Sequence, residues 1–215
     1  MSSQAMSFPI FLNLRGRLCT VIGGGEVAAR KAAALLREGA EVRAVAPELS
    51  QAMRALLVSP NLSHVAREYE EGDLRGSVLA FAATDDAEVN ASVYREAEAS
   101  GIPVNVADDP PHCTFFMPAV VHRDPIAIAI STQGASPALA RHLRERIEEA
   151  IPTGYAHLAR LLGRLRPELL SGIPSEEERK KRLREVLESG VVGLLSRGKF
   201  GEAEELARKL LGLDQ

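Results

Sequence analysis

A glycine-rich turn near the N-terminus is the feature that most limits what this chain can fold into. An apolar run over residues 18–22 leads into Gly23, Gly25 and Ala28, which have the spacing G-x-G-x-x-G/A. A helical pattern follows over residues 29–38, and a second apolar run begins after it. This order of strand, turn, helix and strand predicts the first unit of a dinucleotide-binding fold.

The residue types of the turn suit a bound pyrophosphate. The first glycine permits a tight turn, the second lets backbone N–H groups approach the phosphates, and the helix offers unpaired donors and partial positive charge. Glu48 follows the second apolar run, where an acidic residue binds ribose hydroxyls, and no arginine stands directly at that strand end. This pattern favours NAD over NADP. A structural turn without a ligand is the alternative interpretation.

Apolar runs alternate with helical patterns along the first half of the chain, which predicts an α/β, Rossmann-like doubly wound parallel sheet. Residues 78–83 form a continuous apolar run, as expected for a central strand buried on both faces. The other strands are expected over 42–46, 64–69 and 103–106, and helices over 50–57 and 87–100. Ligands bind beyond the carboxyl ends of such strands. We therefore expect the loops 23–27, 84–86 and 105–109 to meet in one site.

The pattern changes after residue 107. Apolar runs over 119–121 and 126–130 flank a turn at 122–125, which predicts an antiparallel pair. Ser136 then opens a helix that runs to about Ala150. The rest of the chain has helical periodicity, with helices expected over 155–165, 175–189, 191–197 and 201–211. The chain thus divides into a Rossmann domain over 1–112, a segment over 113–150 and a small C-terminal helical domain over 151–215.

The composition argues against several classes of protein. A net charge of −3 does not suit a protein built mainly to bind nucleic acid, and no apolar run approaches the ~20 residues that a membrane span needs. The two cysteines, Cys19 and Cys113, have no metal-ligand spacing. These observations favour a protein of the reducing cytoplasm with no membrane or nucleic-acid partner.

Two carboxylates follow the fifth predicted strand, where a nicotinamide ring would lie. When a hydride moves to a nicotinamide, a proton must leave elsewhere, and a carboxylate beside the ring can accept it. Asp108 is nearer to the strand end than Asp109 and is the better candidate. From position alone, capping of the Pro110–Pro111 turn is an equally good interpretation. His112 and Cys113 extend a possible metal cluster, although ordinary loop packing is the simpler interpretation.

The helix that Ser136 opens is rich in positive charge. Its first turn offers backbone donors to an anion, and Arg141 begins a series of basic side chains. A substrate with several carboxylates would suit this helix, because arginine binds carboxylate through two hydrogen bonds. On charge alone, a solvated helix face with neighbouring glutamates is the favoured interpretation.

Several stretches of the chain, taken together, resemble the precorrin-2 dehydrogenase/sirohydrochlorin ferrochelatase family, the dehydrogenase half of siroheme synthase. The resemblance covers about residues 8–152 and rests on the stretches 8–14, 21–31, 81–86, 105–119 and 131–141. It implies oxidation of precorrin-2 to sirohydrochlorin with NAD⁺, in siroheme or cobalamin synthesis. Insertion of Fe²⁺ or Co²⁺ is a further implied activity. The methyltransferase module of full siroheme synthase has no counterpart here, so we expect a free-standing form.

The resemblance also implies roles for individual residues. Asp108 matches the aspartate used in dehydrogenation, and Asp108 with His112 is the candidate metal pair. The implied cofactor contacts are Gly23, Gly24, Gly25, Glu26, Val27, Pro47, Glu48 and Thr84. The implied substrate contacts are Asn105, Ser136 and Arg141, which would bind the carboxylates of the tetrapyrrole.

Members of this family form homodimers, which implies a dimerisation segment at about residues 115–131. Thr132 occupies the place of a serine that is phosphorylated in siroheme synthase, so this regulation is in doubt. The alternative function is a nucleotide-sensing regulatory Rossmann module without catalysis. The Asp108 to Pro118 segment and the basic helix argue against that alternative.

Overall fold

The computed structural model describes residues 7–214. The chain forms two compact units, with the boundary between Met117 and Pro118. The first six positions of the predicted Rossmann domain and Gln215 lie outside the described residues. The expected division at residues 112 and 150 stays a prediction.

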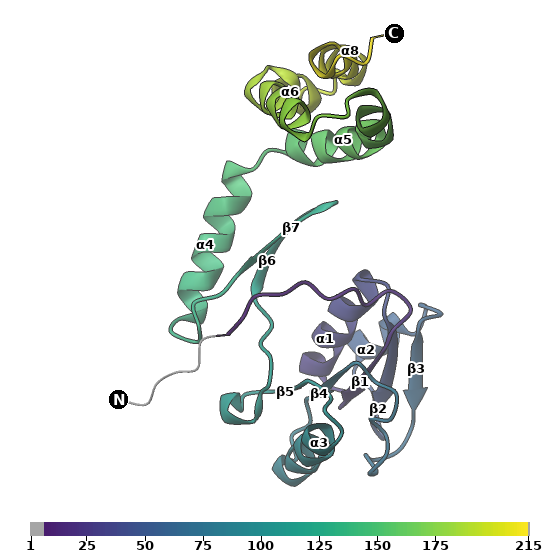
Figure 1. Ribbon diagram of the computed structural model, residues 1–215. Helices are drawn as coiled ribbons and strands as arrows, with labels where there is room; N and C mark the ends of the chain where they lie inside the picture. The colour runs from purple at the N-terminus through teal and green to yellow at the C-terminus, as the bar shows by residue number, and fades with distance from the viewer. Residues whose placement is uncertain (1–6, 215) are drawn as a thin grey trace. The chain divides into compact units, whose positions relative to one another are not determined.

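A five-stranded parallel sheet forms the centre of the first unit (Figure 1). Its strands are β1 (Leu18–Ile22), β2 (Glu41–Val45), β3 (Leu62–Val65), β4 (Leu79–Ala82) and β5 (Val104–Val106). They lie in the order β3-β2-β1-β4-β5, which is the order of a doubly wound fold and confirms the predicted class. All four residues of β4 are buried, as its unbroken apolar run predicted.

Helices cover both faces of this sheet. Helices α1 (Glu26–Arg37) and α2 (Gln51–Leu56) pack on one face, and α3 (Ala87–Ala99) packs on the other. Ser50 caps α2 by accepting a hydrogen bond from the Met53 N–H, and Asp86 caps α3 by accepting from two N–H groups. A 3₁₀ turn, η1 (Pro110–His112), follows β5.

The third strand differs from the prediction of 64–69. It begins at Leu62 and ends at Val65, because these four residues pair in register with Val42–Val45 of β2. The polar segment after Val65 leaves the sheet and enters a hydrogen-bond network instead. Long-range pairing, which the local pattern does not contain, therefore decides the bounds of this edge strand.

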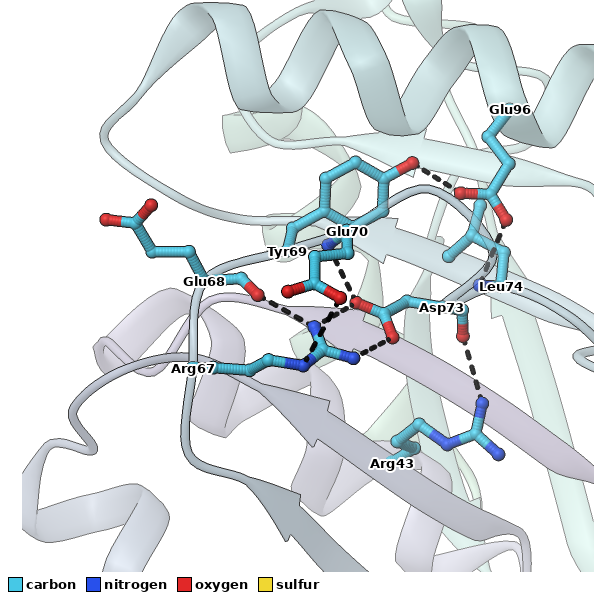
Figure 2. Close-up of polar contacts among 8 residues, drawn as sticks. All are labelled: Arg43, Arg67, Glu68, Tyr69, Glu70, Asp73, Leu74 and Glu96. Carbon is cyan, nitrogen blue, oxygen red and sulfur yellow. Dashed lines mark hydrogen bonds and ion pairs between the residues drawn. The ribbon is translucent and has the colours of Figure 1, made fainter.

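That network holds the connection between β3 and β4 (Figure 2). The guanidinium of Arg67 donates to both oxygens of Asp73, at 2.8 and 2.7 Å, and the Glu70 N–H donates to the same carboxylate at 2.9 Å. The phenol of Tyr69 donates to Glu96 on α3. Each of these two carboxylates is thus engaged by partners within the protein.

The second unit begins with an antiparallel hairpin of β6 (Ala119–Arg123) and β7 (Ile126–Ile130). The predicted hairpin is confirmed, but β6 runs two residues further than expected, so that only Asp124 and Pro125 form the turn. Helix α4 (Pro137–Ala150) contacts both strands and begins at Ser136, as predicted.

Four further helices complete the second unit. They are α5 (Thr153–Gly172), α6 (Glu176–Glu188), α7 (Val191–Ser196) and α8 (Phe200–Leu211), and they share one apolar core. The predicted end of α5 at 165 is wrong: the helix continues past Pro167, because Leu165 and Leu169 stay buried on its apolar face. Throughout residues 7–214, every helix is too short or too polar to cross a bilayer.

Candidate functional site

The glycine turn brings three parts of the sheet together. Gly23 has φ +123°, and a β-carbon there would overlap the carbonyl of Ala83 at the end of β4. A β-carbon on Gly24 would overlap the backbone oxygen of Glu48, and the Gly24 carbonyl accepts a 2.8 Å hydrogen bond from the Ser50 N–H. Both glycines are therefore required by the close approach of the neighbouring backbone.

Gly25 has a different environment. Within the described residues, nothing lies within 4 Å of the place that a β-carbon on Gly25 would occupy. The helix that it opens, α1, begins without a side-chain cap, whereas the other α-helices of the first unit are capped, α2 by a serine and α3 by an aspartate. Open space beside uncapped N–H donors is what a dinucleotide pyrophosphate needs, so this turn fits the predicted cofactor.

Several predicted cofactor residues lie around this turn. Pro47 and Glu48 are exposed, and the backbone of Glu48 packs on Gly24. Thr84 is held in its own loop, since its N–H and its hydroxyl both donate to Asn90 Oδ1, at 3.3 and 2.9 Å. The turn, the end of β2 and the end of β4 thus lie at one edge of the sheet.

Asp108 lies at the same edge, two residues after β5. Its backbone is left-handed (φ +57°), which is uncommon for a residue with a side chain and costs of order 1 kcal/mol. Its side chain is exposed, and among residues 7–214 no hydrogen bond or ion pair engages the carboxylate. Asp108 therefore combines an unfavourable backbone conformation with a carboxylate that, within the described residues, has no hydrogen bond or ion pair. Such a carboxylate is available to a ligand.

Sequence reasoning missed Lys31. Its ammonium donates to Asn105 Oδ1 at 2.7 Å and lies 5.1 Å from the ring centroid of Phe81. Burial lowers the pKa of Lys31, and interactions with Cys113 and Asp108 oppose this shift. The available signal was a lysine on the otherwise apolar face of a predicted helix.

Asn105 is buried, with 8% of its surface exposed. Its amide accepts from Lys31 and donates to the Phe115 carbonyl at 3.1 Å. Both ends of the side chain are therefore used within the protein. A direct contact of Asn105 with substrate stays a prediction.

His112 pairs with Asp109. The His112 Nδ1 lies 2.7 Å from Asp109 Oδ2, and its ring packs edge-on against Tyr94. The Cys113 thiol is hydrogen-bonded to the backbone of Val106, and burial raises its pKa. Residues 7–214 contain no group of three or more His, Cys, Asp or Glu side chains arranged to hold a metal. The Asp108–His112 metal pair thus stays a prediction.

In the second unit, the predicted substrate residues lie at and beyond the start of α4. The Ser136 hydroxyl accepts from the Leu139 N–H at 3.1 Å, and its backbone is held by the Thr132 hydroxyl. Arg144 pairs with Glu148, which also pairs with Arg123. Arg144 therefore follows the interpretation of a paired helix face, and Arg123 ties β6 to that face through Glu148.

Arg141 differs from its neighbours on α4. It is exposed, and in the described part of the chain it makes no ion pair. It is thus the arginine of this helix that best keeps the predicted role of a carboxylate ligand.

The sheet order and the uncapped glycine turn define a dinucleotide-binding protein of the Rossmann type. Three family models match the chain in succession. Residues 10–119 match an NAD(P)-binding family, residues 123–150 match the central part of a sirohaem biosynthesis protein, and residues 154–211 match the sirohaem synthase dimerisation region. The chain belongs to the family of the siroheme synthase N-terminal region, which confirms the resemblance seen in the sequence.

Relatives and a solved structure agree with this assignment. The chain is 44% identical over 187 residues to siroheme synthase of Methylobacillus flagellatus, covering 87% of this chain and 40% of the relative. It is 42% identical over 205 residues to siroheme synthase of Azotobacter vinelandii, covering 95% and 44%. It thus spans less than half the length of these relatives. A solved structure, SirC, precorrin-2 dehydrogenase, matches with TM-score 0.74 and 27% identity, over 93% of this chain and 100% of SirC.

Proposed function

We propose that this chain is a precorrin-2 dehydrogenase that uses NAD⁺ and forms sirohydrochlorin, in siroheme or cobalamin synthesis. The observation that carries the proposal is the unpartnered carboxylate of Asp108, at the sheet edge that also holds the glycine turn. The likeness to SirC and to the siroheme synthases supports this choice of substrate.

The residues of the first unit divide the work of this reaction. The turn from Gly23 to Val27 binds the pyrophosphate through backbone N–H groups, with Pro47 and Thr84 beside it, and Glu48 accepts hydrogen bonds from the ribose. The acidic Glu48 favours NAD⁺ because it would repel the 2′-phosphate of NADP⁺. When bound, the nicotinamide supplies the oxidising power by accepting a hydride from the substrate. Asp108 accepts the proton that the substrate loses, so that the macrocycle gives up one hydride and one proton.

Residues of the second unit bind the macrocycle and a second copy of the chain. Ser136 at the start of α4 and Arg141 on its exposed side bind substrate carboxylates. The match of residues 154–211 to a dimerisation region supports a homodimer. This region differs from the 115–131 segment that the sequence resemblance implied, and pairing through that segment stays a prediction. The unpaired thiols of Cys19 and Cys113 suit the predicted cytoplasmic setting.

An absorbance assay with precorrin-2 tests the proposal. We expect sirohydrochlorin to form with NAD⁺ and more slowly with NADP⁺. In Gly25→Ala, the added methyl group enters open space in the protein but obstructs the phosphates, so we expect the fold to persist while NAD⁺ affinity falls by at least ~10-fold. Oxidation no faster than the uncatalysed background with either nucleotide would contradict the proposal. It would favour the nucleotide-sensing module, particularly if sirohydrochlorin does not bind.

A second candidate activity is insertion of Fe²⁺ or Co²⁺ into sirohydrochlorin. The observation that favours it is again the free carboxylate of Asp108, since metal insertion requires that the macrocycle lose two protons to a base. His112 would then help to guide the metal. Insertion measured without NAD⁺ decides the question, and a rate equal to the protein-free control would exclude this activity.

A further inference from the structure

Helix α1 carries a positive charge on the face that packs against the sheet. Ala28, Ala32 and Leu35 of this helix are buried, and Lys31 lies among them and is half-buried. Burial of an ammonium is unfavourable, as the lowered pKa of Lys31 reflects. An unbranched apolar side chain would fill the same space without this cost, so the charge calls for an explanation.

The contacts of Lys31 join three segments that are far apart in the sequence. Asn105, its hydrogen-bond partner, is 74 residues away on β5. The Asn105 amide in turn holds the Phe115 carbonyl, and the Phe115 ring packs edge-on against Phe81 with centroids 5.3 Å apart. Lys31 therefore connects the helix that opens at the glycine turn to both ends of the 107–115 segment.

Asp108 belongs to this segment. Its left-handed backbone must be imposed by the surroundings, and the segment is anchored on β5 by the Thr114 N–H, which donates to the Val104 carbonyl at 2.9 Å. The Cys113 thiol is hydrogen-bonded to the backbone of Val106, and the Asn105 amide adds a side-chain bond to Phe115 at the far end of the segment. The orientation of the Asn105 amide is selected by Lys31, because an ammonium can only donate and so requires the amide oxygen.

We propose that Lys31 is a positioning residue for the dehydrogenation: through Asn105 it fixes the segment that carries Asp108 relative to the helix that opens at the cofactor turn. The inference rests on the proposed function. A displacement of about 1 Å between a base and the reacting carbon can cost ~100-fold in rate, so a buried charge that fixes this distance would be retained.

Three substitutions test the proposal. Lys31→Met keeps an unbranched stem and removes the charge, Asn105→Leu removes the link, and Arg37→Met removes an exposed charge from the last turn of the same helix. We expect the first two to lower kcat by at least ~10-fold, with KM for NAD⁺ within about two-fold. The control should keep both constants. Lys31→Met that retains kcat within about two-fold, or that raises only KM for NAD⁺, would overturn the proposal.

Chemical rescue separates the charge from simple packing. Lys31→Ala removes three carbons and the nitrogen, which n-propylammonium replaces, while 1-propanol has the same size without the charge. We expect propylammonium to restore kcat in a saturable way and propanol to have no effect. Equal restoration by both compounds would assign Lys31 a packing role and overturn the proposal.

Amide hydrogen exchange gives a measurement that does not depend on activity. The Thr114 N–H should exchange at least ~10-fold faster in Lys31→Met and Asn105→Leu than in the wild type or Arg37→Met. Unchanged exchange would overturn the proposal. If the wild type does not oxidise precorrin-2, the proposed function fails, but the exchange comparison still decides whether Lys31 fixes the segment.

Discussion

Two sets of acidic side chains in the first unit have opposite environments. Between β3 and β4, Asp73 accepts three hydrogen bonds and is 9% exposed. Glu96 on α3 accepts from the Tyr69 phenol and the Leu74 N–H of the same connection (Figure 2). After β5, Asp108 is exposed and, within the described residues, has no hydrogen bond or ion pair, on a left-handed backbone. The carboxylates of Asp73 and Glu96 are hydrogen-bonded within the protein, whereas the carboxylate of Asp108 is free to bind an external partner.

The difference separates stability from function within a single sheet. A carboxylate whose lone pairs are satisfied by the protein stabilises the loop that it joins, and its loss is felt in the free energy of unfolding. A carboxylate without partners contributes little to that free energy, so its loss is felt only in binding or catalysis. Substitution of Asp73 should therefore lower the free energy of unfolding and spare turnover, whereas substitution of Asp108 should lower turnover and spare the free energy of unfolding.

The largest effect is expected from Asp108→Asn. This change removes the proton acceptor while the size of the side chain and its tolerance of a left-handed backbone are kept, so kcat for precorrin-2 oxidation should fall by about 10²–10⁴-fold. The thermal midpoint and NAD⁺ affinity should stay near those of the wild type. Turnover within a few-fold of the wild type would show that Asp108 is not the proton acceptor and would contradict its functional difference from Asp73.

Asp73→Asn should give the reverse result. An amide offers one acceptor oxygen in place of two, so one donor of the Arg67 guanidinium loses its charged acceptor and the free energy of unfolding should fall by about 1–3 kcal/mol. Turnover per folded molecule should not change. Urea unfolding at pH 7 and kinetics at a temperature where the variant is folded test both parts, and a specific loss of turnover would link this network to the site.

A smaller effect of the same sign is expected from Tyr69→Phe. The ring is kept and only the hydroxyl that donates to Glu96 is removed, while Glu96 still accepts from the Leu74 N–H at 3.1 Å. The free energy of unfolding should fall by about 1 kcal/mol. If the Tyr69→Phe/Glu96→Gln double variant loses no more free energy of unfolding than the more destabilised single variant, the two side chains act together. If its loss equals the sum of the two single-variant losses, the result counts against the pairing.

The smallest effect is a difference in acid sensitivity. The Arg67 guanidinium holds the pKa of the Asp73 carboxyl below its usual value, so this contribution is present above about pH 4 and is lost as the pH falls further. Asp73→Asn does not titrate in this range. The stability difference between wild type and variant should thus shrink by about 1 kcal/mol between pH 5 and pH 3 in urea titrations. A constant difference would mean that the folded protein does not lower the pKa of Asp73.

Much of the site could be read from local pattern. The spacing identifies Gly23 and Gly25, and the place of Asp108 after an apolar strand makes it a candidate, because a parallel sheet brings the carboxyl ends of its strands to one edge. Position alone leaves a turn cap equally good for Asp108, and the family resemblance favours the functional role. Lys31 was not recognised, and Asn105 was predicted to face the substrate. The structure pairs His112 with Asp109, and the predicted Asp108–His112 metal pair stays a prediction.

The sequence by itself determined the succession of strands and helices along the chain, the nucleotide-binding turn and the family. Each of these depends on residues that are close along the chain. Only the tertiary structure decided the partner of Lys31 and the end of β3. These depend on side chains and strands that are brought together by folding, across 74 residues in the case of Lys31 and Asn105. A local pattern can indicate that a residue is buried or charged, but the group that it meets is decided by the packing of distant segments.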